Sequence, residues 1–386
     1  MSEVKIELLS LEDLHLSSFL EKNDHLLLHT SAYGRFISSA FHCKYHFVAA
    51  IENDTIMTLL PLVEVKSSIF GKRIISAPYL EYGGFAGDEK SLPLILQWLN
   101  QKYKSSYEYL EIRGGLESFD SSLSSLTIKK NFYKRFVLDL RVPRPLSVDP
   151  LSSSSGTKPN TQQNIESSIF NTVTFSSGSL SAVQFFRSHI QDSKRKAINK
   201  AKRSNVEVKD VPVADLDDFY DLYCRNMRRF GSPPYSKTYF KKFYELLVKP
   251  GLGKIYGAYI DGKIVAALLG LCYRDRVHII IAVSDERSRE HRPNDAVHSE
   301  FIEWSIENQF HFFDFGRVRE ESGQFEYKQK WGPALLDLPS YFVMWNGKDI
   351  PEVDPKKYDL AVRLWRFLPL PVTKMIGHKL RKELGI

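Results

Sequence analysis

The chain has 386 residues, 43% of them hydrophobic and 26% charged, and this composition excludes a largely disordered protein. Because the length exceeds what one ordinary hydrophobic core holds, we expect two domains. The formal net charge of +7 indicates a polyanionic partner, and phosphate, nucleic acid and an anionic membrane surface all stay open.

The first predicted domain covers residues 1–145. Within it, two apolar runs at residues 47–62 flank an Asn-Asp pair, which predicts a β-hairpin. A helix near residues 93–103 and a strand at residues 109–115 follow. Residues 146–181 are dense in Ser, Pro and Thr and have too few apolar side chains to offset the entropy of ordering, so they predict a linker or a surface insertion.

The second predicted domain, residues 182–348, has the clearer pattern. The pair Asp261-Gly262 between two apolar runs is the strongest hairpin signal in the chain. The predicted elements are strands at 206–211, 254–260, 263–273, 277–283 and 311–318, two late strands within 333–345, and helices at 215–230, 236–248 and 295–308.

The two predicted domains look alike. The hairpin at residues 47–62 matches the one at residues 255–271, which indicates an internal repeat. The element order after the linker, β-α-α-β-β-β-α-β-α-β-β, resembles the GNAT acetyltransferase fold. We therefore expect an α/β protein with a mixed sheet, built from two tandem GNAT-like acyltransferase domains.

Five segments carry a closer resemblance. They are SAPYLEYGG (76–84), KRKAINKAKRSNVEV (194–208), FYDLYCRNMRRFGSPPYS (219–236), FDFGRV with the following Glu-Ser-Gly (312–323) and FEYKQKWG (325–332). Through them the chain resembles the Fem family (FemAB type) of aminoacyl and acyl transferases, in particular relatives associated with exopolysaccharide and protein-sorting genes. The resemblance spans most of the chain.

The resemblance implies a transferase. Family members transfer an amino acid from aminoacyl-tRNA to the amine of a peptidoglycan precursor, and we expect an amide bond to form on an amine of a cell-envelope precursor, peptidoglycan-type or polysaccharide-linked. Aminolysis of an activated ester or thioester needs a held amine and a stabilised oxyanion, but no covalent nucleophile. A CoA-dependent N-acyltransferase of a small molecule and a non-catalytic polyanion-binding protein are the alternatives.

Lys328 and Asp314 are the predicted catalytic residues. Lys328 stands where the family has an aromatic-Lys pair, so the resemblance implies that it stabilises the oxyanion; a solvated lysine on a helix is the alternative. Asp314 ends a predicted buried strand, where it either forms a structural ion pair or positions the acceptor amine and accepts its proton. Arg317 either pairs with an acid or binds a carboxylate or phosphate bidentately.

The other predicted substrate-binding residues are Arg195, Lys196, Tyr82, Tyr327 and Trp331. The first two belong to a run, residues 194–203, with six bases and no acid, which predicts contact with the phosphate of a nucleotide-linked or lipid-linked acceptor or of tRNA. A solvated helix face is the alternative for this run. The resemblance implies that Tyr82 lies in a wall of the acceptor cleft, and a plain tight turn is the alternative. Tyr327 and Trp331 flank Lys328 and are predicted to line the cleft, with core packing the alternative for Trp331.

No metal and no tightly bound cofactor is expected. Cys43, Cys224 and Cys272 are far apart, which indicates neither a disulfide framework nor a zinc site. GNAT domains that bind acetyl-CoA carry a Gly-rich turn before the central helix. Residues 285–301 contain no glycine, which disfavours ordinary CoA use, so the donor stays open between aminoacyl-tRNA and acyl-CoA.

The last predicted region, residues 349–386, is a basic amphipathic tail. It interleaves Leu, Trp, Phe and Ile with Arg and Lys, which predicts either peripheral membrane contact or docking on the core. No run approaches the roughly 18 apolar residues of a membrane-spanning helix, and the acidic start does not resemble a signal peptide. We therefore expect a cytoplasmic protein, with contact at the inner face of the membrane left open together with the oligomeric state.

Overall fold

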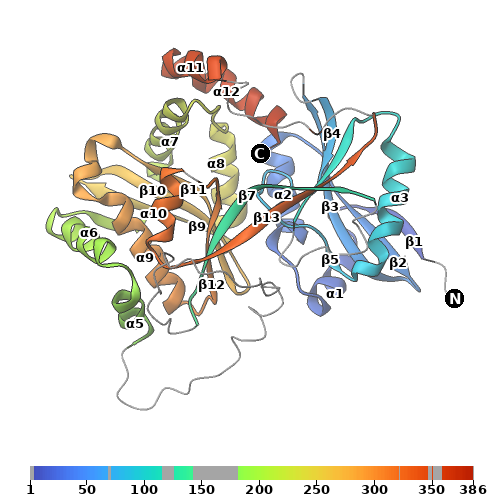
Figure 1. Cartoon of the computed structure of the whole chain (residues 1–386), viewed down its shortest axis with the longest axis horizontal. Coiled ribbons are helices and arrows are strands. Elements are labelled where there is room, and N and C mark those ends of the chain that lie inside the picture. The colour runs from blue at the N-terminus through green and yellow to red at the C-terminus, as the bar shows by residue number, and fades with distance from the viewer. Residues whose placement is uncertain are drawn as a thin grey trace, which may run out of the picture.

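A computed structural model gives the fold of the chain (Figure 1). It describes residues 4–67, 71–114, 126–141, 181–320, 322–346, 350 and 359–385. The predicted linker at residues 146–181 lies outside the described residues, apart from Ser181. Across the described ranges, no helix is long and apolar enough to cross a membrane.

The first half of the chain places a long hairpin between helices α2 and α3. Its elements are β1 (Lys5–Leu9), α1 (His15–Lys22), η1 (Leu27–His29), α2 (Ser31–Phe41), β2 (Tyr45–Glu52), β3 (Thr55–Ser67), β4 (Gly71–Ile75), β5 (Ala86–Gly87), η2 (Glu89–Ser91), α3 (Leu92–Tyr103), β6 (Tyr109–Arg113) and β7 (Ile128–Asp139). The hairpin turns through Asn53 and Asp54, which both adopt positive φ, at 49° and 57°. Such a two-residue turn matches the twist of the flanking strands, as the sequence predicted.

The second half repeats this plan with longer helices. Its elements are α5 (Ala182–His189), α6 (Asp192–Arg203), β8 (Glu207–Asp210), η3 (Val213–Asp215), α7 (Leu216–Phe230), α8 (Lys237–Phe243), the π turn η4 (Tyr244–Val248), β9 (Gly253–Ile260), β10 (Lys263–Tyr273), β11 (Arg276–Ser284), η5 (Glu286–His291), α9 (Pro293–Glu307), β12 (Phe312–Val318), α10 (Gly323–Gln329), β13 (Ala334–Met344), α11 (Asp359–Phe367) and α12 (Leu370–Leu384). The predicted turn at Asp261 and Gly262 is confirmed, with φ of 50° and 74°.

The strands form one mixed sheet in the order β1-β2-β3-β4-β6-β13-β7-β12-β11-β10-β9-β8, with β5 paired to β3. In the first half β2, β3 and β4 are antiparallel neighbours and β4 runs parallel to β6. In the second half β9, β10 and β11 are antiparallel neighbours and β11 runs parallel to β12. The internal repeat and the mixed α/β sheet are therefore confirmed.

The two halves exchange their last strands at the centre of the sheet. Strand β7, from the first half, pairs with β12, whereas β13, from the second half, pairs with β6, and β7 and β13 also pair with each other. The prediction of two strands within residues 333–345 is wrong, because β13 is one strand. It continues through Pro339, which lacks an N–H group, because the pairing with β7 shifts register between Leu338 and Ser340.

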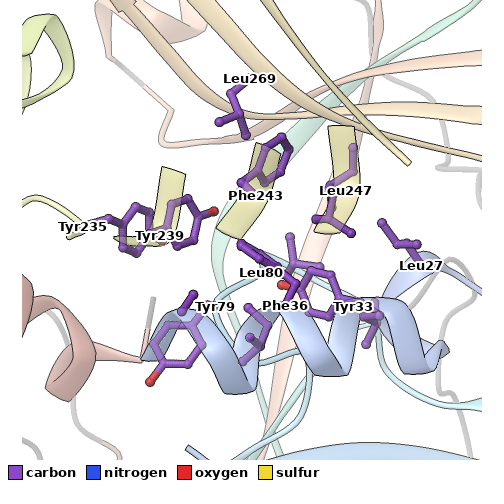
Figure 2. Close-up of a cluster of buried hydrophobic side chains, with 14 of the residues drawn as sticks. Leu27, Tyr33, Phe36, Tyr79, Leu80, Tyr235, Tyr239, Phe243, Leu247 and Leu269 are labelled. Carbon is purple, nitrogen blue, oxygen red and sulfur yellow. The ribbon is translucent and has the colours of Figure 1, made fainter. Parts of the chain in front are cut away.

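A shared hydrophobic core also joins the halves (Figure 2). Phe36 of α2 packs edge-on against Tyr239 and Phe243 of α8, with ring centroids 5.1 and 5.6 Å apart. All three rings are buried, and burying each contributes about 1.5–3 kcal/mol. The residues labelled in this core are Leu27, Tyr33, Phe36, Tyr79 and Leu80 from the first half, and Tyr235, Tyr239, Phe243, Leu247 and Leu269 from the second. Packing across this shared core therefore fixes the position of one half relative to the other.

The C-terminal helix α12 is anchored on both halves. Its last carbonyls accept hydrogen bonds from first-half arginines: Arg73 donates to Leu384 O, and Arg113 donates to Gly385 O at 3.1 Å. Lys374 forms an ion pair with Asp221 of α7, at 2.5 Å. Cationic side chains at a helix C-terminus satisfy otherwise unpaired carbonyls and the helix dipole. This part of the predicted tail is thus docked on the fold.

Candidate active site

A cleft of about 800 Å³ opens where two parallel strands separate. Strands β11 and β12 pair over Arg276–His278 and Phe312–Asp314, and beyond these pairs the edge of β11 that no longer pairs with β12, Ile279–Ser284, lines the cleft. The other walls come from α7, η5, the start of α9, α10 and α12. The cleft therefore lies at the point where the sheet of the second half splays.

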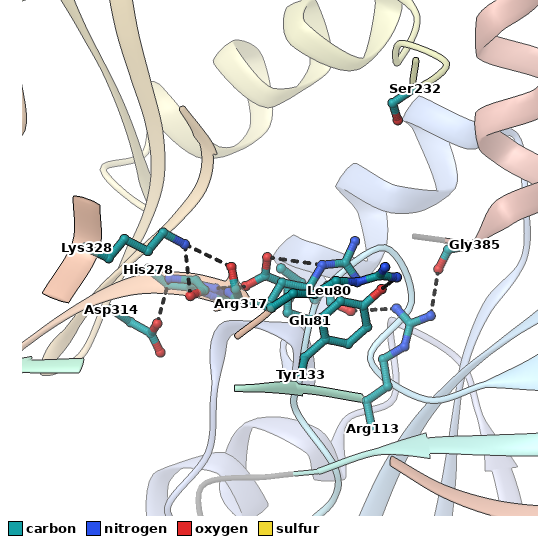
Figure 3. A network of polar contacts seen from close by, with 12 residues as sticks. Leu80, Glu81, Arg113, Tyr133, Ser232, His278, Asp314, Arg317, Lys328 and Gly385 are labelled. Carbon is teal, nitrogen blue, oxygen red and sulfur yellow. Dashed lines mark hydrogen bonds and ion pairs between the residues drawn. The ribbon is translucent and has the colours of Figure 1, made fainter. Parts of the chain in front are cut away.

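The first half supplies Glu81 to this cleft (Figure 3). Glu81 Oε2 accepts hydrogen bonds from His278 Nε2, at 3.1 Å, and from Arg317 N, at 2.7 Å. Gly316 makes the approach possible: it has φ of +73°, and a Cβ there would lie 2.8 Å from Glu81 Oε2 and 2.7 Å from Ile279 O. Sequence reasoning did not single out Glu81, although it stands inside the SAPYLEYGG match.

Lys328, predicted from the sequence, lines the cleft. It lies on α10, whose N-terminus is capped by Ser322, and its Nζ donates to Gly316 O at 3.2 Å and to Arg317 O at 2.9 Å. Its third N–H has no acceptor in the part of the chain that the structure describes. Burial lowers the pKa of Lys328 from its ordinary value, although Glu81 and Asp314 act in the opposite direction.

The carboxylate of Glu81 balances this ammonium. Burial alone would raise the pKa of Glu81, but the hydrogen bond from His278 and the charges of Arg317 and Lys328 outweigh burial and lower it. Glu81 is therefore ionised at neutral pH. The site thus combines one ammonium and one carboxylate, contributed by different halves of the chain.

Asp314 and Tyr82 lie behind the cleft and do not line it. Asp314 is fully buried and pairs with Arg135 at 3.0 Å, and it also accepts hydrogen bonds from Tyr82 Oη, at 2.6 Å, and Gly316 N, at 2.8 Å. These contacts form a structural ion pair, which is one of the two roles that the sequence left open for Asp314. A catalytic role for Asp314 stays a prediction, and the contacts do not favour it.

Of the other predicted residues around Lys328, some line the cleft and one packs in the core behind it. Arg317 lines the cleft, with Nε 3.7 Å from Glu81 Oε1 and its guanidinium over the ring of Tyr133. Tyr327 lines the cleft and donates its hydroxyl to a backbone carbonyl of α9. Trp331 is 1% exposed and packs in the core behind the cleft.

The basic run is not a single surface. Arg195 and Lys196 lie on α6 outside the cleft, and Arg195 pairs with Asp192. Lys194 instead is buried: it pairs with Asp295 at 2.6 Å and lies 3.3 Å from the ring centre of Tyr327. Burial lowers the pKa of Lys194 to about 8. Lys194 is thus the base of this run that contacts the cleft wall, and the sequence did not single it out.

The segment that precedes α9 carries two arginines at the cleft. Arg289 and Arg292 line it, both are exposed, and neither has a carboxylate partner within the described ranges. Arg292 adopts φ of 59°, the left-handed conformation that a glycine would take more easily. The turn before α9 therefore forms without a glycine, and Arg292 places its guanidinium at the N-terminus of this helix.

Comparison with known proteins agrees with this architecture. Residues 186–329 match the family model described as an acetyltransferase (GNAT) domain. No curated protein sequence matches the chain. Among solved structures, FemX is similar in fold, with a TM-score of 0.62 and 11% identity over 92% of this chain and 100% of that one.

Two more solved structures share the fold. L-PGS from Bacillus licheniformis has a TM-score of 0.52 and 16% identity over 93% of this chain and 98% of its own. A tandem GNAT protein from the clavulanic acid biosynthesis pathway has a TM-score of 0.51 and 11% identity over 90% of this chain and 100% of its own. The domain match contains Lys328, Arg317 and most of the cleft, and the fold of the tandem neighbour agrees with the internal repeat. The chain is therefore a transferase with a GNAT acetyltransferase domain at residues 186–329, and its fold is similar to those of FemX, L-PGS and the tandem GNAT protein.

Proposed function

We propose that the chain transfers an acyl or aminoacyl group to an amine in this cleft, with Lys328 stabilising the oxyanion. The observation that carries the proposal is the ammonium of Lys328, which two backbone carbonyls hold beside the cleft while its third N–H stays available. Attack of the amine on an ester or thioester carbonyl forms the C–N bond and puts negative charge on the carbonyl oxygen. A fixed ammonium at that oxygen stabilises the charge, and the C–O or C–S bond then breaks.

Glu81 is proposed to orient the attacking amine. Its Oε2 already accepts two hydrogen bonds, whereas within the described residues its Oε1 has only Arg317 Nε nearby, at 3.7 Å. Because Glu81 is ionised, Oε1 can accept a hydrogen bond from the amine. The Glu81 carboxylate accepts the proton that the amine loses, and His278, which donates to Oε2, holds that carboxylate in place.

The proposed acceptor is an amine of a cell-envelope precursor, peptidoglycan-type or polysaccharide-linked. Its support is the Fem-like sequence segments together with the shared fold of FemX and L-PGS. Incubation of the enzyme with an extracted envelope precursor pool and a labelled donor tests it. Labelled product from that pool supports the acceptor class, and product only with small soluble amines would replace it with the small-molecule alternative.

The donor is proposed to bind through its phosphates at Arg289 and Arg292. Replacing both with glutamine should raise the KM for the donor roughly ten- to a hundredfold and leave kcat nearly unchanged, because charged hydrogen bonds remote from the reacting carbonyl hold the donor equally before and during reaction. Kinetics with acyl-CoA in one series and charged tRNA in another measure this. Arg274→Gln, an exposed arginine outside the cleft, is the control.

The exposed bases of α6 distinguish the two donors. Lys196, Lys200 and Lys202 face solvent, outside the cleft, where the repeated phosphates of a tRNA backbone would add contacts along the helix. Changing these three lysines to glutamine should weaken only the tRNA reaction. Polyanion binding by α6 without any turnover in either series would instead favour the non-catalytic alternative.

The outer face of α11 is proposed to contact an anionic lipid bilayer. Leu360, Leu364 and Phe367, here called the α11 stripe, follow helical spacing and are 71%, 59% and 86% exposed. Exposed Arg363 and Arg366 lie on the same helix, while Trp365 on the inner face is buried. Apolar side chains among bases match a surface with acyl chains and negative headgroups.

Vesicle binding tests the α11 stripe. Leu364→Glu combined with Phe367→Glu should weaken cosedimentation with phosphatidylglycerol vesicles by roughly tenfold or more, because two large apolar side chains no longer enter the bilayer. The matched control is Leu14→Glu, since Leu14 is 90% exposed but lies on the other half of the molecule. Unchanged vesicle binding, or a dimer that the double variant dissociates, would contradict the bilayer assignment.

A further inference from the structure

Arg381 of α12 is a cleft-lining arginine without an acidic partner. Its Nη1 donates to Ser232 Oγ and its Nη2 to Tyr235 Oη, both at 3.3 Å, and the guanidinium lies over the ring of Tyr235. Its Nε is buried and has no hydrogen-bond partner in the described parts of the chain. Arg381, Ser232 and Tyr235 all line the cleft that contains Lys328.

Two other arginines of the cleft wall have a carboxylate nearby, whereas Arg289 and Arg292, which have none in the described segments of the chain, are exposed to solvent. Arg229 forms an ion pair with Glu286 at 2.5 Å, and Arg317 lies 3.7 Å from Glu81. Arg381 forms no ion pair with any carboxylate of the described residues and contacts neutral hydroxyl groups only. Arg381 is half-buried, and a guanidinium that is partly removed from water without a counter-charge loses hydration that a bound anion would offset.

The position of Arg381 separates it from the reacting centre. In Figure 3, Ser232, a contact of Arg381, lies well apart from both Lys328 and Glu81. Arg73 and Arg113 at the C-terminus of α12, together with the Lys374–Asp221 ion pair, hold the helix that carries Arg381 into the cleft. The fold thus builds a fixed cation at the far end of the cleft from the ammonium.

We propose that Arg381, Ser232 and Tyr235 form a subsite for a carboxylate group of the amine substrate, a proposal that rests on the proposed acyl transfer. The guanidinium of Arg381 supplies one positive charge, and the two hydroxyls are neutral, so the net charge of the subsite matches one carboxylate. The planar fork of the arginine side chain also fits the two oxygens of a carboxylate. A substrate with an amine at one end and a carboxylate at the other would be held at Glu81 and Arg381. Amino-acid and peptide acceptors have this chemistry.

Ligand-dependent stabilisation of the full chain tests the subsite without any need for turnover. Alanyl-alanine should raise the Tm of the wild type more than its C-terminal amide, which lacks the carboxylate, and Arg381→Gln should weaken the dipeptide roughly ten- to a hundredfold. Inorganic phosphate is titrated in parallel. Arg274→Gln is the control, and it should bind the dipeptide as the wild type does.

The outcomes separate the subsite from the proposed chemistry. Lys328→Met should keep the dipeptide effect even if it abolishes transfer, so loss of transfer with retained binding leaves the subsite standing. If Arg381→Gln does not fold, Ser232→Ala keeps the charge and should weaken the dipeptide by a smaller factor, roughly two- to tenfold. Equal effects of dipeptide and amide, or dependence of phosphate alone on Arg381, would overturn the carboxylate assignment.

Discussion

Replacing Lys328 with methionine is expected to lower kcat by roughly a hundred- to a thousandfold with little change in the KM of either substrate. Methionine keeps an unbranched side chain but removes the ammonium, so the oxyanion loses a stabilising charge that the ground state does not need. Transfer of labelled acyl or aminoacyl groups to the precursor pool measures the effect. Lys330→Met, an exposed lysine on the same segment, should leave kcat unchanged.

The pH dependence of the same reaction gives a second readout. Burial lowers the pKa of Lys328 from 10.5, so the ammonium loses its proton, and wild-type turnover should fall, at a pH below 10.5. In Lys328→Arg this alkaline limb should disappear, because a guanidinium does not titrate in that range. An alkaline limb that stays in place in the arginine variant would assign the titration to another group.

Local signals predicted most of the repeat, and they did so for a physical reason. Asp261 and Gly262 adopt positive φ at low cost, so the hairpin is encoded in two residues. The exchange of β7 and β13 is different, because it depends on pairing between segments far apart in sequence. No local pattern distinguishes a strand that completes its own half from one that completes the other.

The sequence predicted only those site residues that one local motif contains. Lys328 and Arg317 are recognisable from the residues beside them, and both line the cleft. Glu81 gains its meaning from His278 and Arg317, which lie far away in the sequence. In α6, Lys194 turns inward because it lies on the small apolar face of the helix. The charge pattern alone favoured its neighbours Arg195 and Lys196. Arg381 looked like one more base of an amphipathic tail until α12 was placed against both halves.

Replacing Asp314 with asparagine is expected to lower the free energy of unfolding by about 3–5 kcal/mol, because it leaves Arg135 buried without its counter-charge. The pair is 3.0 Å apart, with side chains 5% and 0% exposed. Chemical denaturation measures the change. The double variant Arg135→Met with Asp314→Leu should recover part of the loss, since neither charge then stays in the core.

The pH dependence of stability has a definite sign. Burial alone would raise the pKa of Asp314, but the charges of His278 and Arg135 outweigh burial and lower it below 3.8. A carboxyl with a lowered pKa stabilises the fold above its unfolded-state value, and this contribution is lost as the pH falls from 3.8 through the folded-state pKa. The asparagine variant should therefore lose less stability in that range than the wild type. If it instead unfolds like the wild type but transfers no acyl group, Asp314 acts in the reaction and the ion pair is secondary.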